Sequence, residues 1–196
     1  MPPGRPRSEE SRRAILAAAD ELLLSHGLDA VTMDAVAERA GASKATIYRW
    51  WPSKELLALD ALVISLEDVL ARVRTDTGTL RGDLRAILRP AMTQLSQRPY
   101  GRVIAALIAE IHRDAAFAEV WQERYVTARR RHARAAFRRA IERGEISAKT
   151  DVELALDMIY GPIYHRLLHG HAPLSQAVAY RLVDTVIGVA GSPPSG

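Results

Sequence analysis

The stretch VTMDAVAERAGASKATIYRWWPSKELL, Val31 to Leu57, decides the fold of this chain. Thr32 is a favourable N-cap, and the apolar residues behind it recur at helical spacing until Gly41, where a left-handed residue can end a helix. Ser43 caps a second short segment, which Pro52 ends before a third begins. Two short helices joined by a turn of about three to four residues form a helix-turn-helix, which places its second helix in the DNA major groove.

The second of these helices, over Ser43 to Trp50, has an outward surface suited to DNA. Only Ile47 and one small alanine can face inward. Basic side chains can neutralise phosphates or pair with a guanine edge, and hydroxyl groups can bind phosphate oxygens. A purely structural surface helix would more usually carry Glu and Lys pairs four residues apart. We therefore predict DNA contacts from Lys44, Thr46, Tyr48, Arg49 and Trp50.

At these residues the chain resembles the TetR family of transcriptional regulators. The match is GASKATIYRWWPSKELL, preceded by TMDAVAERAG and by the amphipathic segment SEESRRAILAAADELLLSHG. The resemblance implies that the same five residues face the operator. It further implies that Thr32 and Lys54 anchor phosphates at the starts of the flanking helices. Pro52 departs mildly from the residue often found at its position.

Length and composition narrow the class of protein. The chain has 196 residues, enough for one large domain or two small ones, and a net charge of +4 that suits a polyanionic partner. It has no cysteine, which excludes disulfides, thiolate metal sites and cysteine nucleophiles. Without a long apolar run or a signal-peptide core, a cytoplasmic protein with no membrane partner is expected.

The rest of the chain has helical rather than strand periodicity, so the predicted class is all-α. A three-helix DNA-binding head with a basic N-terminal arm is expected over 1–52, and an effector-binding and dimerisation bundle over 53–196. A kink or interruption is expected at Pro90 and an interruption at Gly161-Pro162, and the tail SPPSG is expected to be disordered. The predicted helices outside the helix-turn-helix cover about 8–26, 53–74, 80–97, 99–112, 116–143, 151–169 and 174–189.

Two arginines precede the first predicted helix in the segment PPGRPR. Prolines favour an extended arm, and Arg5 and Arg7 on either side of Pro6 can enter a narrow minor groove or bind phosphate. The alternative is a disordered leader with incidental arginines.

The predicted bundle over 53–196, called the body below, requires a function of its own. An apolar run over 99–112 and aromatic residues spaced by four could line a pocket between helices, although such stripes more often form core. The TetR resemblance favours the pocket, because family members commonly bind an apolar or amphipathic inducer there. The candidate effector-binding residues are Met92, Ile104, Leu107, Ile108, Ile111, Phe117, Trp121 and Tyr125.

The last two predicted helices are candidates for dimerisation, because their apolar stripes are too broad for a single partner face. The segments GPIYHRLLHGHAPL and RLVDTVIGVA resemble the C-terminal part of one TetR subgroup, and the resemblance implies a four-helix homodimer interface. Two recognition helices about 34–36 Å apart would then read a palindrome. The predicted interface residues are Ile159, Ile163, Leu167, Leu182 and Val186.

Three further features carry less weight. His165, His169 and His171 have permissible zinc spacing but lack a cysteine or carboxylate partner, so no metal or other cofactor is expected. The basic run ARRRHARAAFRR, Ala128 to Arg139, is interpreted as a solvated helix face or an ion-pair network rather than as a nucleic-acid site. No catalytic motif occurs, so the chain is not expected to be an enzyme.

These observations together predict a ligand-responsive repressor that binds a palindromic operator as a homodimer and releases it when a small apolar or amphipathic molecule binds the body. Two alternatives remain. One is a regulator of the same fold controlled by a protein partner or acting as an activator. The other is a helical enzyme or carrier with a vestigial head.

Overall fold

The computed structural model describes residues 5–190, apart from the side chains of residues 5–8, 98 and 190. No strand occurs in this range, and the predicted all-α class is confirmed. The predicted disordered tail lies outside the described residues. The helices are α1 (Arg5–His26), η1 (Leu28–Ala30), α2 (Met33–Ala40), α3 (Lys44–Trp50), α4 (Lys54–Ala71), α5 (Leu80–Ser96), α6 (Arg98–Ile111), α7 (Ala115–Val120), η2 (Trp121–Val126), α8 (Thr127–Glu142), α9 (Val152–His169) and α10 (Gln176–Ala190).

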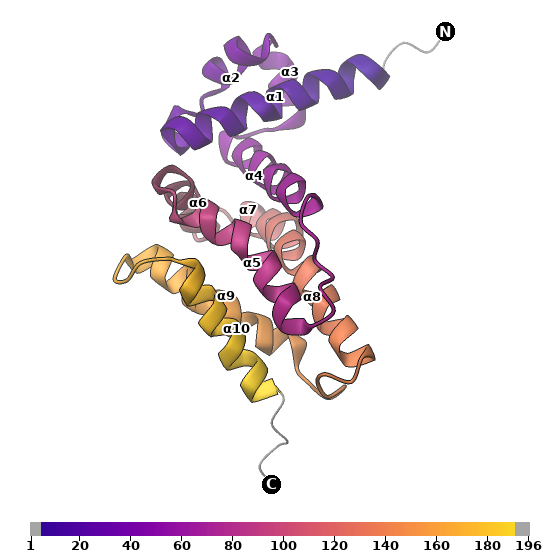
Figure 1. The fold of residues 1–196 in the computed structure, drawn as a ribbon. Helices are drawn as coiled ribbons and strands as arrows, with labels where there is room; N and C mark the ends of the chain where they lie inside the picture. Colours follow the sequence, from indigo (N-terminus) through magenta and orange to yellow (C-terminus); the bar gives the residue numbers. More distant parts are fainter. Residues whose placement is uncertain (1–4, 191–196) are drawn as a thin grey trace. The chain divides into compact units, whose positions relative to one another are not determined.

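Packing groups these helices into two compact units, and Figure 1 labels the α-helices of both. Among the described residues, unit 1 consists of 5–65 and 98–125, and unit 2 of 66–97 and 126–190. The chain therefore passes from unit 1 to unit 2 within α4, and returns to unit 1 for α6 and α7. This grouping follows packing, whereas the division predicted at residue 52 follows the order of functions along the chain, and that division stays a prediction.

Unit 1 is built around α1, which packs against α2, η1 and α6. Its apolar face was predicted from helical spacing, and Ile15, Ala19 and Leu23 are each fully buried. Val36 of α2 and Ile47 of α3 are also fully buried. Burial of this stripe fixes the position of α2 and α3, because such short helices are unstable without tertiary packing.

In unit 2, α5 packs against α8 and α10, while α9 packs against α8 and α10. Asp83 at the start of α5 is fully buried. Its carboxylate accepts hydrogen bonds from the Thr77 backbone N–H (2.6 Å), the Thr77 hydroxyl (2.8 Å) and Arg139 (2.8 Å). Glu145 accepts a further hydrogen bond from the backbone N–H of Leu80 (2.7 Å). These contacts hold the loop before α5 against α8.

Several predicted element boundaries are wrong. α1 begins at Arg5 rather than near residue 8, and prolines are compatible with a first turn because its N–H groups have no intrahelical acceptor. The single helix predicted over 116–143 contains the π-helical segment η2. The interruption predicted at Gly161-Pro162 is absent, because Pro162 lies inside α9, and Pro90 lies inside α5 without ending it. A proline removes one helical hydrogen bond, and burial of the helix face on both sides maintains the helix.

Candidate DNA-binding interface

The predicted caps of the helix-turn-helix are confirmed. The Thr32 hydroxyl accepts a hydrogen bond from Ala35 N–H (3.1 Å) at the start of α2. Gly41 adopts a left-handed conformation with φ of 60°, and its N–H bonds back to the carbonyls of the last turn. Ser43 then accepts from Thr46 N–H (3.1 Å) and caps α3. The turn geometry therefore follows from one glycine and two hydroxyl side chains.

The α3 helix separates a buried side from an exposed one. Ile47 is fully buried, whereas Tyr48 and Trp50 are 52% and 37% exposed. Lys44 and Arg49 are also exposed. Thr46 is half-buried, and its hydroxyl lies 2.8 Å from the Ser43 hydroxyl. Four of the five residues predicted to contact DNA are thus exposed on α3, and the fifth supports the cap.

Charged groups connect this face to its neighbours. Lys44 forms an ion pair with Asp34 of α2 (2.5 Å). The hydrogen bond to Asp34 and its negative charge raise the pKa of Lys44 above its ordinary value. A lysine is positively charged at neutral pH even without this shift, as a phosphate contact requires.

Arginines surround the ring of Trp50. The Arg49 guanidinium lies 5.9 Å from its centroid, and Arg12 of α1 lies 5.8 Å from the same ring and 5.9 Å from that of Trp51. These are cation–π distances. Sequence reasoning missed Arg12, because its proximity to Trp50 depends on tertiary packing between distant parts of unit 1.

Trp51 is the second residue that sequence reasoning missed. Its ring is buried at the C-terminal end of α3, and its indole N–H donates to Asp60 of α4 (2.9 Å). Arg124 of η2 donates to both oxygens of the same carboxylate (2.8 and 3.0 Å). Asp60 therefore links the end of the recognition helix to the π-helical segment within unit 1. The adjacent tryptophans could have drawn attention to this position. The sequence did not show that Trp51 is buried while Trp50 is exposed.

The flanking anchor residues have different structural settings. Thr32 is exposed as the N-cap of α2, and Lys54 is half-buried at the first position of α4. Arg5 and Arg7 belong to the first turn of α1 rather than to an extended arm. Their side chains lie outside the described part of the chain, so the proposed groove contact stays a prediction.

The residues predicted to bind an effector are divided between the units. Met92 belongs to unit 2, and the other seven belong to unit 1. The rings of Trp121 and Tyr125 are stacked at 4.3 Å, with the ring of Phe117 6.4 Å from that of Trp121. All three rings are buried, as are Ile104 and Leu107, while Ile108 and Ile111 are half-buried. The aromatic cluster, meaning Phe117, Trp121 and Tyr125, is therefore packed core in this structure.

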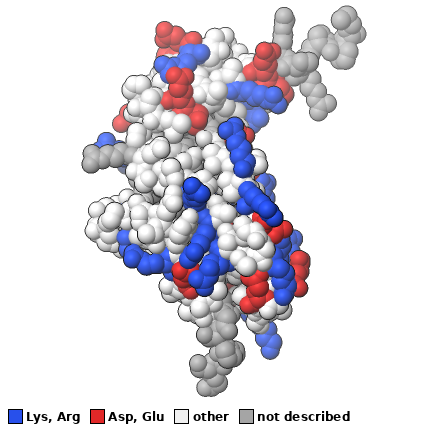
Figure 2. Space-filling model, viewed as in Figure 1, with Lys and Arg blue, Asp and Glu red and all other residues white. Residues whose placement is uncertain are grey.

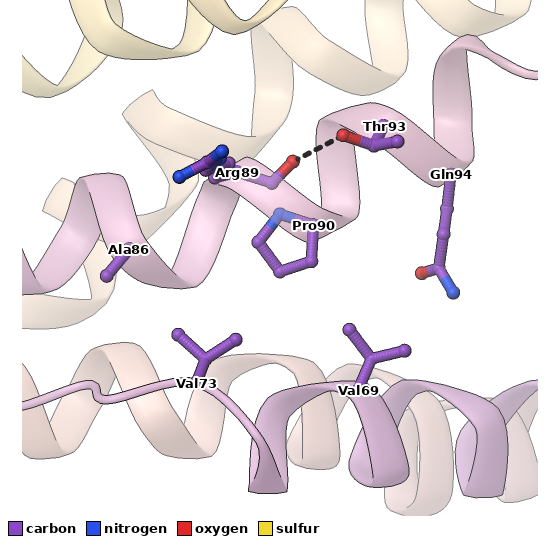
Figure 3. A pocket seen from close by; sticks show the side chains of 7 residues that line it. All are labelled: Val69, Val73, Ala86, Arg89, Pro90, Thr93 and Gln94. Carbon is purple, nitrogen blue, oxygen red and sulfur yellow. Dashed lines mark hydrogen bonds between the residues drawn. The ribbon is translucent and has the colours of Figure 1, made fainter.

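A cavity of about 480 Å³ lies elsewhere, within unit 2. Figure 3 shows Val69 and Val73 pointing towards the ring of Pro90 on α5, with the Gln94 side chain extending into the same space. Ala86, Arg89 and Thr93 complete its lining. No residue of this cavity was among the predicted effector contacts.

The predicted dimer residues are mostly buried in their own unit. Ile159, Ile163 and Val186 are at most 3% exposed, whereas Leu167 and Leu182 are half-buried. The first three residues pack inside unit 2, because α9 and α10 contact each other and the helices beside them. The large apolar side chains that α9 exposes are Leu154, Met158 and Leu168.

The basic run of α8 forms ion pairs, which is one of the two arrangements predicted for it. Arg134 pairs with Glu153 (2.6 Å), Arg130 pairs with Glu153 (3.1 Å) and Asp157, and Arg131 pairs with Glu67. The hydrogen bonds from Arg134 and Arg130 lower the pKa of Glu153 to about 2. On the face shown in Figure 2, basic and acidic side chains are interspersed. Pairing of this kind stabilises the helix surface and does not leave a basic strip for nucleic acid.

The three histidines near the end of α9 lie close together. The His165 ring is 4.5 Å from that of His169 and 4.9 Å from that of His171. Among the described residues, no group of His, Cys, Asp or Glu is arranged to hold a metal ion. No described helix is long and apolar enough to cross a bilayer.

The capped α2–turn–α3 unit and its exposed basic and aromatic face define a helix-turn-helix DNA-binding protein. Comparison with known proteins agrees. The family model described as "Bacterial regulatory proteins, tetR family" matches residues 15–61, and "Tetracyclin repressor-like, C-terminal domain" matches residues 74–186. The chain therefore belongs to the TetR family of transcriptional regulators, as its resemblance implied, and it is not an enzyme.

Individual relatives cover nearly the whole chain. It is 41% identical over 165 residues to the HTH-type transcriptional regulator YdeS of Bacillus subtilis (strain 168), covering 84% of this chain and 82% of that protein. This chain is 35% identical over 184 residues to the DNA-binding transcriptional repressor TetR of Mycobacteroides abscessus, covering 92% of this chain and 94% of that protein. The crystal structure of the TetR family transcription regulator SCO0332 aligns with a TM-score of 0.82 and 39% identity, over 94% of this chain and 100% of that one.

Proposed function

We propose that this regulator is a repressor that binds a palindromic operator as a homodimer and releases it when a small apolar or amphipathic molecule binds the body. The observation that carries the DNA-binding part is the α3 surface. Ile47 anchors the helix while Lys44, Tyr48, Arg49 and Trp50 remain exposed. Exposed donors on a rigidly capped helix can reach phosphates and base edges together. The repressor sign is supported by the Mycobacteroides abscessus relative, which is a transcriptional repressor.

The residues of this surface have separate proposed roles. Lys44 and Tyr48 contact phosphates, Arg49 reads a base edge, and Trp50 supports Arg49 through their cation–π contact. Thr32 and Lys54 sit at the starts of α2 and α4, where backbone N–H groups also favour a phosphate. Thr46 contributes by maintaining the Ser43 cap.

Release by an effector requires two conformations of the head, one of which fits the operator. Ligand binding shifts the population only if the ligand prefers the other conformation, by about 1–3 kcal/mol in typical cases. The Trp51–Asp60–Arg124 hydrogen bonds support such a mechanism, because they connect the recognition helix to a π-helical segment. π-helical turns are rare and are frequently found at functional sites. The predicted effector residues of α6, α7 and η2 would bind a ligand only by opening their present packing.

The sign of regulation can be tested by in vitro transcription from a promoter that carries the operator. Repression predicts that added protein lowers transcript yield from this promoter and leaves a promoter without the operator unchanged. Increased yield would identify an activator of the same fold. A shift of apparent melting temperature in a screen of apolar compounds would support the ligand-responsive part, because a ligand that binds the native state stabilises it.

A further inference from the structure

The cavity in unit 2 has the dimensions and walls of a small-molecule site. Its volume of about 480 Å³ lies within the range of about 300–1,000 Å³ typical of such sites. Val69, Val73, Ala86 and Pro90 provide apolar walls from the C-terminal part of α4, the residues that follow it, and α5. These walls therefore favour a largely apolar ligand.

One polar atom among the residues that line this cavity is a hydrogen-bond acceptor that lacks a donor. Gln94 Oε1 is buried and has no hydrogen-bond partner among the described residues, so a ligand hydroxyl reaches it once the flexible Gln94 side chain turns towards the cavity. Pro90 has no backbone N–H, so the Ala86 carbonyl loses the donor that an α-helix would supply four residues later. The Thr93 hydroxyl donates to the Arg89 carbonyl (3.1 Å), as drawn in Figure 3, and therefore does not donate to Gln94 Oε1. A buried acceptor without a donor is unfavourable, so a ligand that supplies one gains affinity.

Arg89 adds a positive charge at this site. It lines the cavity and is exposed. The positive charge of Arg89 favours a ligand whose hydrogen-bond donor is an O–H group, because the oxygen of that group carries partial negative charge. A hydroxyl meets this requirement, and an acidic hydroxyl of the phenol kind meets it best.

We propose that this cavity is the effector site, and that its ligand is a largely apolar molecule whose hydroxyl donates a hydrogen bond to Gln94 Oε1. The inference rests on the proposed ligand-responsive function. It replaces the aromatic cluster of unit 1 as the place of binding, because those rings are already packed against each other. The occupied cavity would act on Val69 of α4, the same helix that begins beside the recognition helix.

The test compares two probes of similar shape, 2-naphthol and 2-methoxynaphthalene, which differ in the donor. We expect the full-length protein to bind 2-naphthol about tenfold more tightly in calorimetric titrations. Gln94→Leu should remove this preference by weakening only 2-naphthol. Gln97→Leu makes the same chemical change at an exposed residue outside the cavity, and should leave both affinities unchanged. Ala86→Phe should fill the cavity and weaken both probes.

Equal binding of the two probes to the unsubstituted protein would overturn the proposal, as would no saturable binding of either. Preference for 2-naphthol that survives Gln94→Leu would also overturn it. A thermal melt of Gln94→Leu guards against misfolding, and no loss of stability is expected because the replaced acceptor is unpaired. Operator binding is measured on the same preparations. Operator binding without probe binding would support the proposed regulator and overturn the proposed effector site. Probe binding without operator binding would support the site and contradict the proposed regulator.

Discussion

At the scale of single residues, substitutions of Arg49 and Tyr48 separate base recognition from phosphate binding by the recognition helix α3. Arg49→Ala should cost about 1–3 kcal/mol of operator affinity and relax the preference for one base, because a base-edge contact is lost. Tyr48→Phe should weaken binding to every sequence alike, because only a phosphate contact is lost. Both effects can be measured by fluorescence anisotropy on operators with single-base changes. Equal loss on all sequences for Arg49→Ala would contradict its base-reading role.

Asp83 is a buried, hydrogen-bonded carboxylate of unit 2, and we expect it to make the stability of this unit depend on pH. Burial alone would raise the pKa of this carboxyl, but hydrogen bonds donated by Thr77 and Arg139 hold its pKa below the ordinary value of 3.8. A lowered pKa in the folded state means that the stabilisation is present at neutral pH and is lost as the pH falls through the folded pKa.

Asp83→Asn should therefore lower the free energy of unfolding by about 3 kcal/mol near neutral pH, because the charge of Arg139 loses its buried partner. The difference from the unsubstituted protein should shrink as the pH falls below the ordinary carboxyl pKa and through the lowered pKa of folded Asp83, because protonation removes the charge that pairs with Arg139. Urea unfolding at neutral pH and across an acid series measures this. Asp76→Asn is a matched control, since Asp76 is 66% exposed and lies 3.7 Å from the same arginine. Equal stability of Asp83→Asn and the unsubstituted protein at neutral pH would show that the network is dispensable.

At the scale of elements, Asp60 determines how firmly α3 is held. Asp60→Ala removes the acceptor of both Trp51 and Arg124, so the C-terminal end of the recognition helix should loosen. We expect operator affinity to fall about tenfold or more, since imprecise positioning of base contacts is costly. Asp60→Asn keeps an acceptor for Trp51 and should retain more affinity.

The matched control for this substitution is Asp68→Ala, which makes the same change at an exposed position of α4. It should leave operator affinity unchanged. Affinities are compared by anisotropy, and circular dichroism confirms that each variant is folded. An Asp60→Ala protein with unaltered operator affinity would exclude the anchoring role.

The same elements show what a sequence can and cannot predict. Thr32, Gly41 and Ser43 act through local capping chemistry, so the helix-turn-helix could be located to within a residue or two. The π-helical segment and the continuous helices through Pro90 and Pro162 depend on tertiary packing, which overrides local preference. Gln94 could not be singled out, because an unpaired acceptor is recognisable only when its surroundings are known.

At the scale of the whole molecule, periodicity predicted which helices are apolar but not which side each uses. Ile159 and Ile163 belong to the apolar stripe of α9, yet they pack within unit 2. A broad stripe contains both a core face and an outer face, and the sequence alone does not separate them. The exposed Leu154, Met158 and Leu168 fall on one helical face together with Gly161, where a second helix can approach closely. We infer that this outer face of α9 is the dimer surface.

Met158→Glu should therefore shift the protein from dimer to monomer without lowering the stability of unit 2, because Met158 is 37% exposed in the single chain. Sedimentation velocity measures the mass, and thermal unfolding measures the stability. Ile163→Glu is the contrasting variant and should destabilise the fold, since Ile163 is fully buried. A Met158→Glu protein that remains a dimer would place the interface elsewhere.

The central claim is that this TetR-family chain reads a specific operator through α3. Fluorescence anisotropy on DNA from upstream of its own gene, against scrambled DNA with nonspecific competitor at physiological salt, tests it most directly. The account predicts specific binding at least about a thousandfold tighter than nonspecific binding, with two protomers per palindrome and loss of the preference in Arg49→Ala. Equal affinity for operator and scrambled DNA across the upstream region, unchanged by Arg49→Ala, would contradict it.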